Sequence, residues 1–134
     1  MSKSVLYAVN TNAQTVAVGG TVNFGQPVRR FGCNCRLVNG NGIIHGDGYY
    51  KISAAMILTP AAAGVLTVAL YKDGAAIPGA VYSQEVTTDT WEVAIDDVIV
   101  RELRTCCDTE STVTAVITTL GATVSEARLT LERV

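Results

Sequence analysis

Hydrophobic and polar residues alternate with a period of two in many short segments of this chain. A period of two places successive side chains on opposite faces of a β-strand, whereas a helix needs a period of 3.6 residues, which no stretch sustains. The alternation predicts strands over residues 5–9, 14–18, 21–24, 33–38, 43–45, 49–58, 64–71, 77–84, 90–100, 112–118 and 124–134. The pattern therefore predicts an all-β protein of about ten strands.

Turn-forming residues separate these segments. Asn39-Gly40 and Asp73-Gly74 are strong signals for hairpin turns, because both residue types accept positive φ angles. Pro27 lacks a backbone donor and limits the run around it to an edge strand or a loop. Strands at this spacing indicate an antiparallel two-sheet sandwich, and a jelly roll is the natural solution at 134 residues. With no linker and no repeat of fixed period, we expect a single jelly-roll domain over residues 1–134.

Residues 52–71 form an uncharged segment of twenty residues, the length that a helix needs to cross a bilayer. Pro60 and Gly64 interrupt its centre, where a spanning helix would lose a backbone hydrogen bond. On both sides of this interruption the apolar residues follow the period of a strand. We therefore expect two strands joined by a turn, and no membrane partner.

The strand expected around residues 49–59 is apolar on both faces. One face carries Tyr50, Ile52, Ala54, Met56 and Leu58. The other face carries Tyr49, Ala55 and Ile57 among three polar residues. A strand that meets water on one side normally alternates between apolar and polar residues. Tyr49, Ala55 and Ile57 therefore either point toward the threefold axis of a homotrimer or pack beneath a second sheet of the same subunit.

Charge and composition change this picture little. Nearly half of the residues are hydrophobic (49%), 16% are charged, and the net charge is −2 with ten scattered basic residues. A nucleic-acid-binding surface needs convergent cations, so we expect no nucleic acid as a partner. The first residues contain no hydrophobic stretch long enough for a signal peptide, and this predicts synthesis in the cytoplasm.

The four cysteines are candidates for covalent cross-links. Cys33 and Cys35 lie two apart on a predicted strand, so both thiols should project from the same face, whereas the adjacent Cys106 and Cys107 should project from opposite faces. The alternative is that the thiols stay unpaired, because a chain made in the cytosol begins reduced and oxidises only after release. Neither spacing has the gap of two to four residues that is usual in zinc sites.

The remaining chemical groups favour no catalysis. His45 lies beside a predicted turn, with no motif around it for a nucleophile or an orienting partner. Asp96-Asp97 and the pair Asp108 and Glu110 suit turns at a sheet end better than a calcium site. No phosphate loop, nucleotide fingerprint or paired-carboxylate site is present. We therefore expect no catalytic residue, no cofactor and no metal, and the chain is not predicted to be an enzyme.

Gly48-Tyr49-Tyr50-Lys51-Ile52 places an aromatic residue two positions after a Gly and an apolar residue two positions further on, at the start of a long alternating strand. This resembles the Gly-x-Tyr-x-(Phe/Ile) signature of the complement and tumour necrosis factor-like jelly-roll superfamily, and residues 68–74 resemble its next strand and hairpin. Residues 93–98 resemble its Leu-x-x-Gly-Asp-x-Val turn, with Asp96 in place of the usual Gly. Residues 127–134 resemble its closing core strand.

Within that superfamily the chain is most similar to the bacterial and bacteriophage branch. The Ala- and Thr-rich composition carries this likeness, together with Arg29-Arg30-Phe31-Gly32 and Cys106-Cys107-Asp108. The branch includes phage head-fibre and capsid-decoration proteins and the C-terminal domains of collagen-like spore-surface glycoproteins, and its members are usually trimers. The chain lacks the Gly-x-y stalk of the spore glycoproteins.

The resemblance implies a non-enzymatic homotrimer on the exterior of a phage virion, which binds a capsid or other virion protein and stabilises the shell. The alternative is a carbohydrate-binding receptor or adhesin module on a phage fibre or on a bacterial cell or spore surface. In that case, loops such as residues 39–42 or 87–90 contact a surface glycan. Exposed aromatic rings usually supply the stacking platform for sugars, and only 6% of the residues are aromatic, which weakens this alternative.

Overall fold

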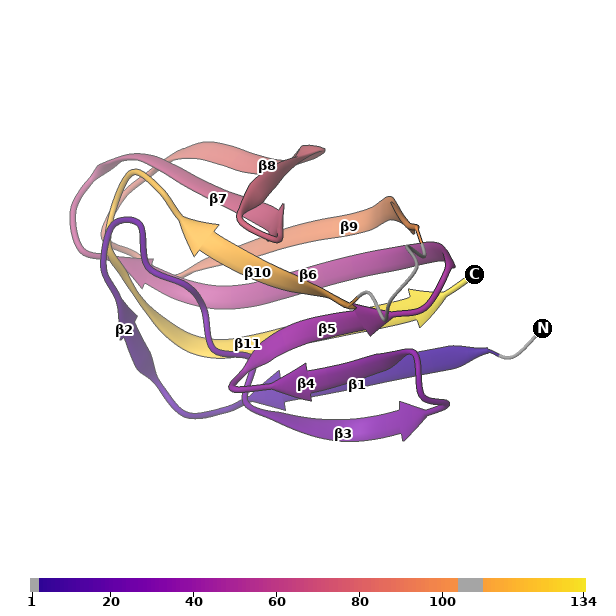
Figure 1. Ribbon diagram of the computed structural model, residues 1–134. Coiled ribbons are helices and arrows are strands. Elements are labelled where there is room, and N and C mark those ends of the chain that lie inside the picture. Colours follow the sequence, from indigo (N-terminus) through magenta and orange to yellow (C-terminus); the bar gives the residue numbers. More distant parts are fainter. Residues whose placement is uncertain (1–2, 104–109) are drawn as a thin grey trace.

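The computed structural model describes residues 3–103 and 110–134, which form two antiparallel sheets stacked face to face (Figure 1). Eleven strands lie within these residues, and they confirm the all-β sandwich. The strands are β1 (Ser4–Asn10), β2 (Gln14–Val16), β3 (Gln26–Phe31), β4 (Cys35–Val38), β5 (Asn41–His45), β6 (Gly48–Pro60), β7 (Gly64–Lys72), β8 (Ala75–Val86), β9 (Trp91–Glu102), β10 (Glu110–Ile117) and β11 (Ala122–Arg133).

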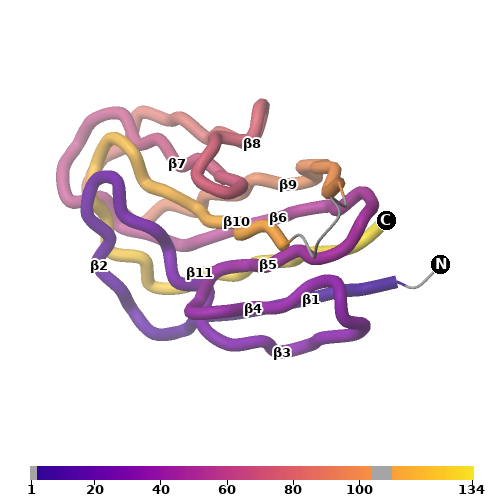
Figure 2. Tube along the Cα trace, viewed as in Figure 1, coloured from indigo at the N-terminus to yellow at the C-terminus, as the bar shows by residue number. Residues whose placement is uncertain are grey.

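Strands distant in sequence become neighbours in both sheets. The six-stranded sheet has the order β3-β1-β11-β6-β9, and β2 also pairs with β11. The five-stranded sheet has the order β4-β5-β10-β7-β8. Because Ser4 at the start of β1 pairs with Arg133 at the end of β11, both ends of the chain lie at one end of the sandwich (Figure 2).

The uncharged segment 52–71 folds back as expected, into β6 and β7. β6 lies between β11 and β9, whereas β7 lies between β10 and β8 in the opposite sheet. The side chains of Tyr50, Ile52, Ala54, Met56 and Leu58 point into the space between the sheets and are buried. In the described part of the chain there is no helix with the length and apolar character needed to cross a membrane.

Both predicted hairpin turns are confirmed. The central residues have positive φ angles in each, 52° and 78° at Asn39 and Gly40, and 51° and 81° at Asp73 and Gly74. Two positive φ angles define the type I′ turn, whose twist matches that of the flanking strands. The turns join β4 to β5 and β7 to β8.

The predicted strands differ most from the structure between residues 21 and 35, where β3 also forms without having been predicted as a strand. Residues 21–24 form no strand and contribute a single bridge, between Thr21 and Val116. The alternation of this segment arises because Val22 and Phe24 insert their side chains into the core, while a backbone ladder forms later, in β3. β3 contains Pro27 and lies at the edge of its sheet, where a missing donor is tolerated. β4 begins at Cys35, two residues later than expected.

Candidate interaction surfaces

The six-stranded sheet turns one face away from the five-stranded sheet, and this side is named the outer face here. Tyr49, Ala55 and Ile57 lie on it, because β6 alternates without a bulge of its own and its other face is buried in the core. Among the described residues, no second sheet of the same subunit covers these three side chains. β1 is apolar on this face too, since it presents Val5, Tyr7 and Val9 there.

Tyr49 lies at the end of the outer face nearest the chain termini. Its side chain is 51% exposed, and the guanidinium of Arg101, its partner on β9, lies 5.6 Å from the ring centroid. Ile99, two residues earlier on β9, is 53% exposed. A cation over an aromatic face orients the ring, so Tyr49 stands as a fixed apolar group beside a positive charge.

Ala55 lies in a hollow in the middle of the outer face. Its neighbours across the sheet are Ala94 on β9 and Arg128 on β11, and the hollow that they line has a volume of about 240 Å³. The two alanines form its floor because their side chains end at Cβ. Glu92, Asp96 and Arg128 also line the hollow, so its rim is charged.

Ile57 is flanked by carboxylates. Its cross-strand neighbours are Glu92 on β9 and Glu126 on β11, and its side chain is half-buried between them. Along a strand that rises about 3.3 Å per residue, Ile57 lies about 26 Å from Tyr49. The three candidate residues thus form one line along β6 and no compact patch.

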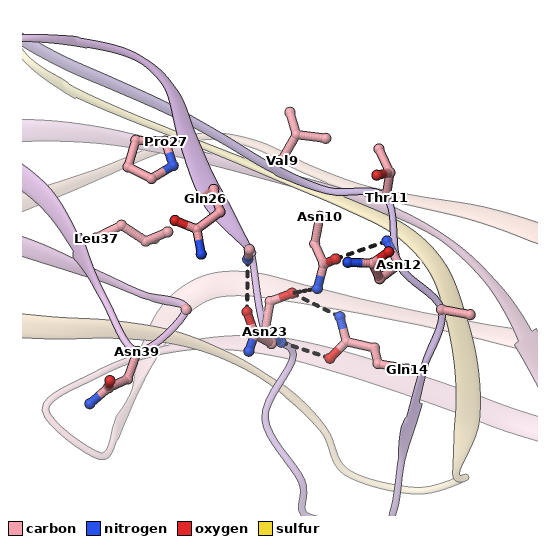
Figure 3. Close-up of a pocket in the computed structure, with 13 residues that line it drawn as sticks. Val9, Asn10, Thr11, Asn12, Gln14, Asn23, Gln26, Pro27, Leu37 and Asn39 are labelled. Carbon is pink, nitrogen blue, oxygen red and sulfur yellow. Dashed lines mark hydrogen bonds between the residues drawn. The ribbon is translucent and has the colours of Figure 1, made fainter.

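A second surface, whose residues Figure 3 shows from close by, lies beyond those ends of β1 and β4 that point away from the chain termini. It is an open cavity of about 830 Å³, named the amide cavity here. Its lining consists of Val9, Asn10, Thr11, Asn12, Ala13, Gln14, Asn23, Gly25, Gln26, Pro27, Leu37, Asn39 and Gly40. Six of these residues are Asn or Gln, and none is charged or aromatic.

Hydrogen bonds hold one wall of the amide cavity in place. Asn10 Nδ2 and Gln14 Nε2 donate to the carbonyl oxygen of Asn23, at 3.0 and 2.8 Å. Gln14 Oε1 accepts from the backbone N–H of Asn23 at 2.9 Å, and Asn23 Oδ1 accepts from that of Gly25 at 2.7 Å. These bonds join the end of β1 to β2 and to the segment before β3. The wall is therefore formed before any ligand arrives.

The loops predicted from the sequence to contact a glycan contain only part of this cavity. Asn39 and Gly40, from the loop 39–42 expected to contact a glycan, belong to the lining, whereas the loop 87–90 does not. Asn10, Gln14 and Gln26 went unnoticed because each one resembles an ordinary turn or strand-end residue. The sequence feature that indicates this cavity is the high frequency of Asn and Gln between residues 10 and 41.

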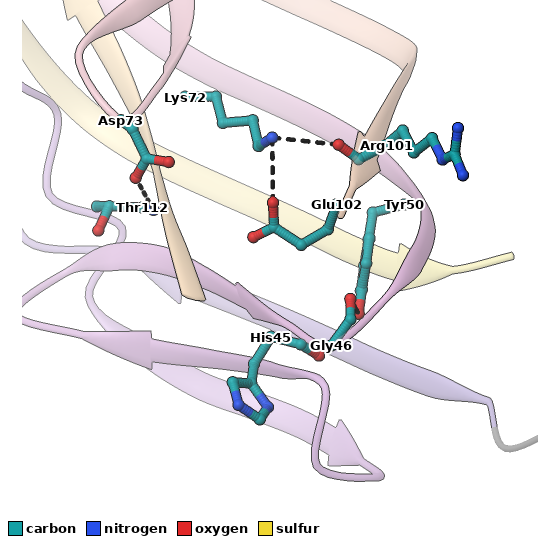
Figure 4. A network of polar contacts seen from close by, with 8 residues as sticks. All are labelled: His45, Gly46, Tyr50, Lys72, Asp73, Arg101, Glu102 and Thr112. Atoms are coloured by element: carbon teal, nitrogen blue, oxygen red, sulfur yellow. Dashed lines mark hydrogen bonds and ion pairs between the residues drawn. The ribbon is translucent and has the colours of Figure 1, made fainter. Parts of the chain in front are cut away.

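A polar network closes the sandwich at the end nearest the termini (Figure 4). The Tyr50 hydroxyl lies 2.8 Å from the carbonyl oxygens of both His45 and Gly46, and burial raises the pKa of this phenol. Lys72 Nζ lies 3.2 Å from Oε1 of the buried Glu102 and also donates to the Arg101 carbonyl. Lys72 pairs with one carboxylate oxygen of Glu102, whereas Oε2 is buried without a hydrogen-bond partner among the described residues. The Tyr50 bonds thus join β6 to the end of β5, and the Lys72 contacts join β7 to β9.

The groups considered for catalysis or metal binding are dispersed. Asp97 forms an ion pair with Lys51, 3.4 Å between Nζ and Oδ1, and Glu110 forms one with Arg36. Asp97 also has a φ angle of 57° where the pairing of β6 with β9 shifts register, so Asp96-Asp97 marks a bulge. Among the described residues, no three His, Cys, Asp or Glu side chains cluster as a metal site would require.

Cys33 and Cys35 do not share a face, which corrects the sequence prediction. Cys33 lies in the turn before β4 and is exposed, whereas Cys35 begins β4 and is fully buried. Both are free thiols. The prediction failed because it extended the strand through the turn that joins β3 to β4. Cys106 and Cys107 lie outside the described residues.

Comparison with known proteins identifies the fold by structure alone. No family model matches the sequence, and no curated protein matches it. Murine APRIL at pH 5.0 superimposes with a TM-score of 0.70 at 14% identity, covering 99% of this chain and 100% of that chain. The globular domain of zebrafish complement 1qA gives 0.67 at 9% identity, covering 96% and 94%. The fold is the complement and tumour necrosis factor-like jelly roll.

A viral protein has the same fold. The PRD1 vertex protein P5 superimposes with a TM-score of 0.64 at 10% identity, covering 98% of this chain and 96% of that chain. At these identities the likeness concerns the arrangement of the strands and not individual site residues. The jelly roll expected from the Gly48–Ile52 signature is thereby confirmed.

Proposed function

We propose that this protein is a non-enzymatic structural protein that forms a homotrimer and decorates the outside of a bacteriophage particle, as a capsid-decoration or head-fibre element. Its partners are two further copies of itself and a capsid or other virion protein, whose shell it stabilises. The observation that carries the proposal is the outer face, where two strands of a two-layer sandwich present apolar side chains. Tyr49 is exposed there and Val5, Tyr7, Val9 and Ile57 are partly exposed, whereas Ala55 is buried within the subunit.

The outer face favours self-association for a physical reason. A strand whose other side meets water normally places polar residues there, yet β1 presents Val5, Tyr7 and Val9, and β6 presents Tyr49, Ala55 and Ile57. Removing a side chain such as Ile or Val from water contributes about 1.5–3 kcal/mol. Because the β6 residues form a line, a threefold axis that runs along this strand would bring three copies of each together.

The location on a virion is supported by the fold. The PRD1 vertex protein P5 belongs to a virus particle and has the same strand arrangement, and the sequence resembles the phage branch of the superfamily.

Light scattering on the purified protein tests the trimer. We expect a mass about three times the 14.1 kDa of one chain. In Ile57→Arg the new guanidinium lies between Glu92 and Glu126, so the single subunit tolerates it while an apolar interface does not. We expect this variant to elute as a monomer. Val65→Arg, at a 52% exposed position on the other sheet, is the matched control and should remain trimeric. A monodisperse wild-type monomer would refute the trimer.

Immunogold electron microscopy tests the location separately. Antibodies against the purified protein should label intact particles of the phage whose genome encodes this chain, at regular positions on the capsid. Label on the tail fibres alone, or none on the particles, would exclude capsid decoration and leave the trimer result unaffected.

A further inference from the structure

We propose that the amide cavity is a binding site for a neutral carbohydrate. This inference goes beyond the structural role, because it adds a ligand and a binding site for it, whose residues Figure 3 shows. It rests on residues other than those named for the outer face, with which the cavity shares only Val9.

The lining selects for hydroxyl groups. Each carboxamide of Asn or Gln offers an acceptor oxygen and a donor NH₂, and each sugar hydroxyl likewise accepts and donates. The lining contains six such side chains and one hydroxyl, that of Thr11. Since the cavity has no charged side chain, it offers no ion pair to a phosphate, sulfate or sialic acid, and their desolvation would be uncompensated. A neutral polyhydroxylated ligand fits this chemistry best.

Several Asn and Gln side chains of the lining have donors and acceptors that form no hydrogen bond to other described residues. The side chains of Asn12, Gln26 and Asn39 make no hydrogen bond to another described residue, in contrast to those of Asn10 and Gln14, which hold the wall. Asn23 uses its Oδ1 on Gly25, while its Nδ2 has no partner among the described residues. The cavity therefore combines a fixed wall with free donors and acceptors on exposed side chains, whose ordering on binding costs about 0.5–1.5 kcal/mol each.

The size and the apolar residues of the cavity agree with a sugar. A volume of about 830 Å³ falls within the usual range for small-ligand sites. Val9, Pro27 and Leu37 interrupt the amides and offer contact to the C–H groups of a pyranose ring. Because no aromatic ring lines the cavity, hydrogen bonds and not stacking would supply the specificity.

A peptide is the competing ligand, since amides also match peptide groups. Peptides that bind β-proteins usually extend an exposed strand edge through main-chain hydrogen bonds. The free groups here are side chains from three separate segments, around residues 12, 26 and 39, that surround a hollow. This arrangement favours a compact ring over an extended chain.

Titration of ¹⁵N-labelled protein, followed by NMR, tests the proposal. The probes are maltose, lactose, mannobiose and N,N′-diacetylchitobiose at millimolar concentration, with sialyllactose and a Gly-Ser peptide as the charged and the peptide comparison. We expect at least one neutral disaccharide to shift the side-chain NH₂ signals of Asn12, Gln26 and Asn39. The same residues should not respond to sialyllactose or to the peptide.

Three variants locate the binding. Gln26→Ala removes one free amide, and Asn39→Gly removes another while keeping a residue that accepts the positive φ of the turn. Each should weaken binding of the responsive disaccharide about 5- to 10-fold, the loss expected for one hydrogen bond. Gln84→Ala, also an exposed amide on an edge strand, is the matched control and should bind as the wild type does.

The proposal is overturned by any of three results. These are no shift with all four neutral disaccharides, binding that both Gln26→Ala and Asn39→Gly retain in full, or a stronger response to the peptide or to sialyllactose. The spectra of the variants report folding directly, so loss of binding is separated from loss of structure.

Discussion

Of the two cysteines that the structure describes, only Cys35 has a thiol whose chemistry is altered by burial. Its side chain is fully buried at the start of β4, and burial raises the pKa of the thiol from 9.0 to about 12. Arg133 and Arg30 oppose this shift, and Glu132 adds to it, but the loss of hydration is the largest cause. The thiolate is the reactive form of cysteine, so the structure makes Cys35 much less reactive than the exposed Cys33.

The stability of the protein should therefore fall at high pH in a way that depends on Cys35. The folded state keeps the proton that the unfolded state loses above pH 9, so this contribution is complete below pH 9 and is lost as the pH rises toward 12. Urea unfolding in the presence of a reductant should show a loss of about 1.4 kcal/mol per pH unit in that window. Cys35→Ala should lack this component. Equal slopes for the two proteins would contradict the prediction.

At the scale of one element, the turn between β4 and β5 depends on Gly40 for two reasons. Its φ angle is 78°, and a Cβ atom at this position would collide with the side-chain amide of Asn23. The main chain of Gly40 also accepts a hydrogen bond from Phe24 N–H at 2.9 Å. The turn thus connects the five-stranded sheet to the wall of the amide cavity.

Gly40→Ala should consequently destabilise the fold more than a substitution at a glycine where the positive φ angle is strained but the new Cβ atom meets no neighbour. Gly79 is the matched control, because its φ is 80° and a Cβ there would meet nothing within 4 Å. We expect a loss of about 1 kcal/mol for Gly79→Ala and about 2–4 kcal/mol for Gly40→Ala, measured by urea unfolding. Equal losses would show that Asn23 moves aside without cost.

The whole molecule is a two-layer sandwich in which every strand except β4 and β8 pairs with a strand distant in sequence, and this topology favours cooperative folding. If three copies associate through the outer face, unfolding is coupled to dissociation. We expect a single thermal transition whose midpoint rises by about 3 °C for each tenfold increase in protein concentration. Differential scanning calorimetry over a range of concentrations measures this. A midpoint independent of concentration would indicate a monomer, and two transitions would contradict a single domain.

Much of the fold was predictable because local patterns and global structure agree. The alternation from Tyr50 to Leu58 describes the buried face of β6, and Asn39-Gly40 and Asp73-Gly74 form the turns that their backbone preferences indicate. The error at residues 21–24 arose because alternating apolar residues occur both in strands and in segments that insert side chains into the core without pairing. Val22 and Phe24 alternate because both enter the core, although almost no ladder forms around them.

The sequence by itself determined the strand content, the hairpins and the buried face of β6, because these depend on side-chain period and on the φ angles that single residues accept. The tertiary structure alone decided which strands are neighbours, which face of β6 stays uncovered and which amides share a cavity. Asn10, Gln26 and Asn39 lie together because β1 ends, β3 begins and the β4–β5 turn lies at the same place. No local sequence pattern encodes contact between segments that are separate in the chain.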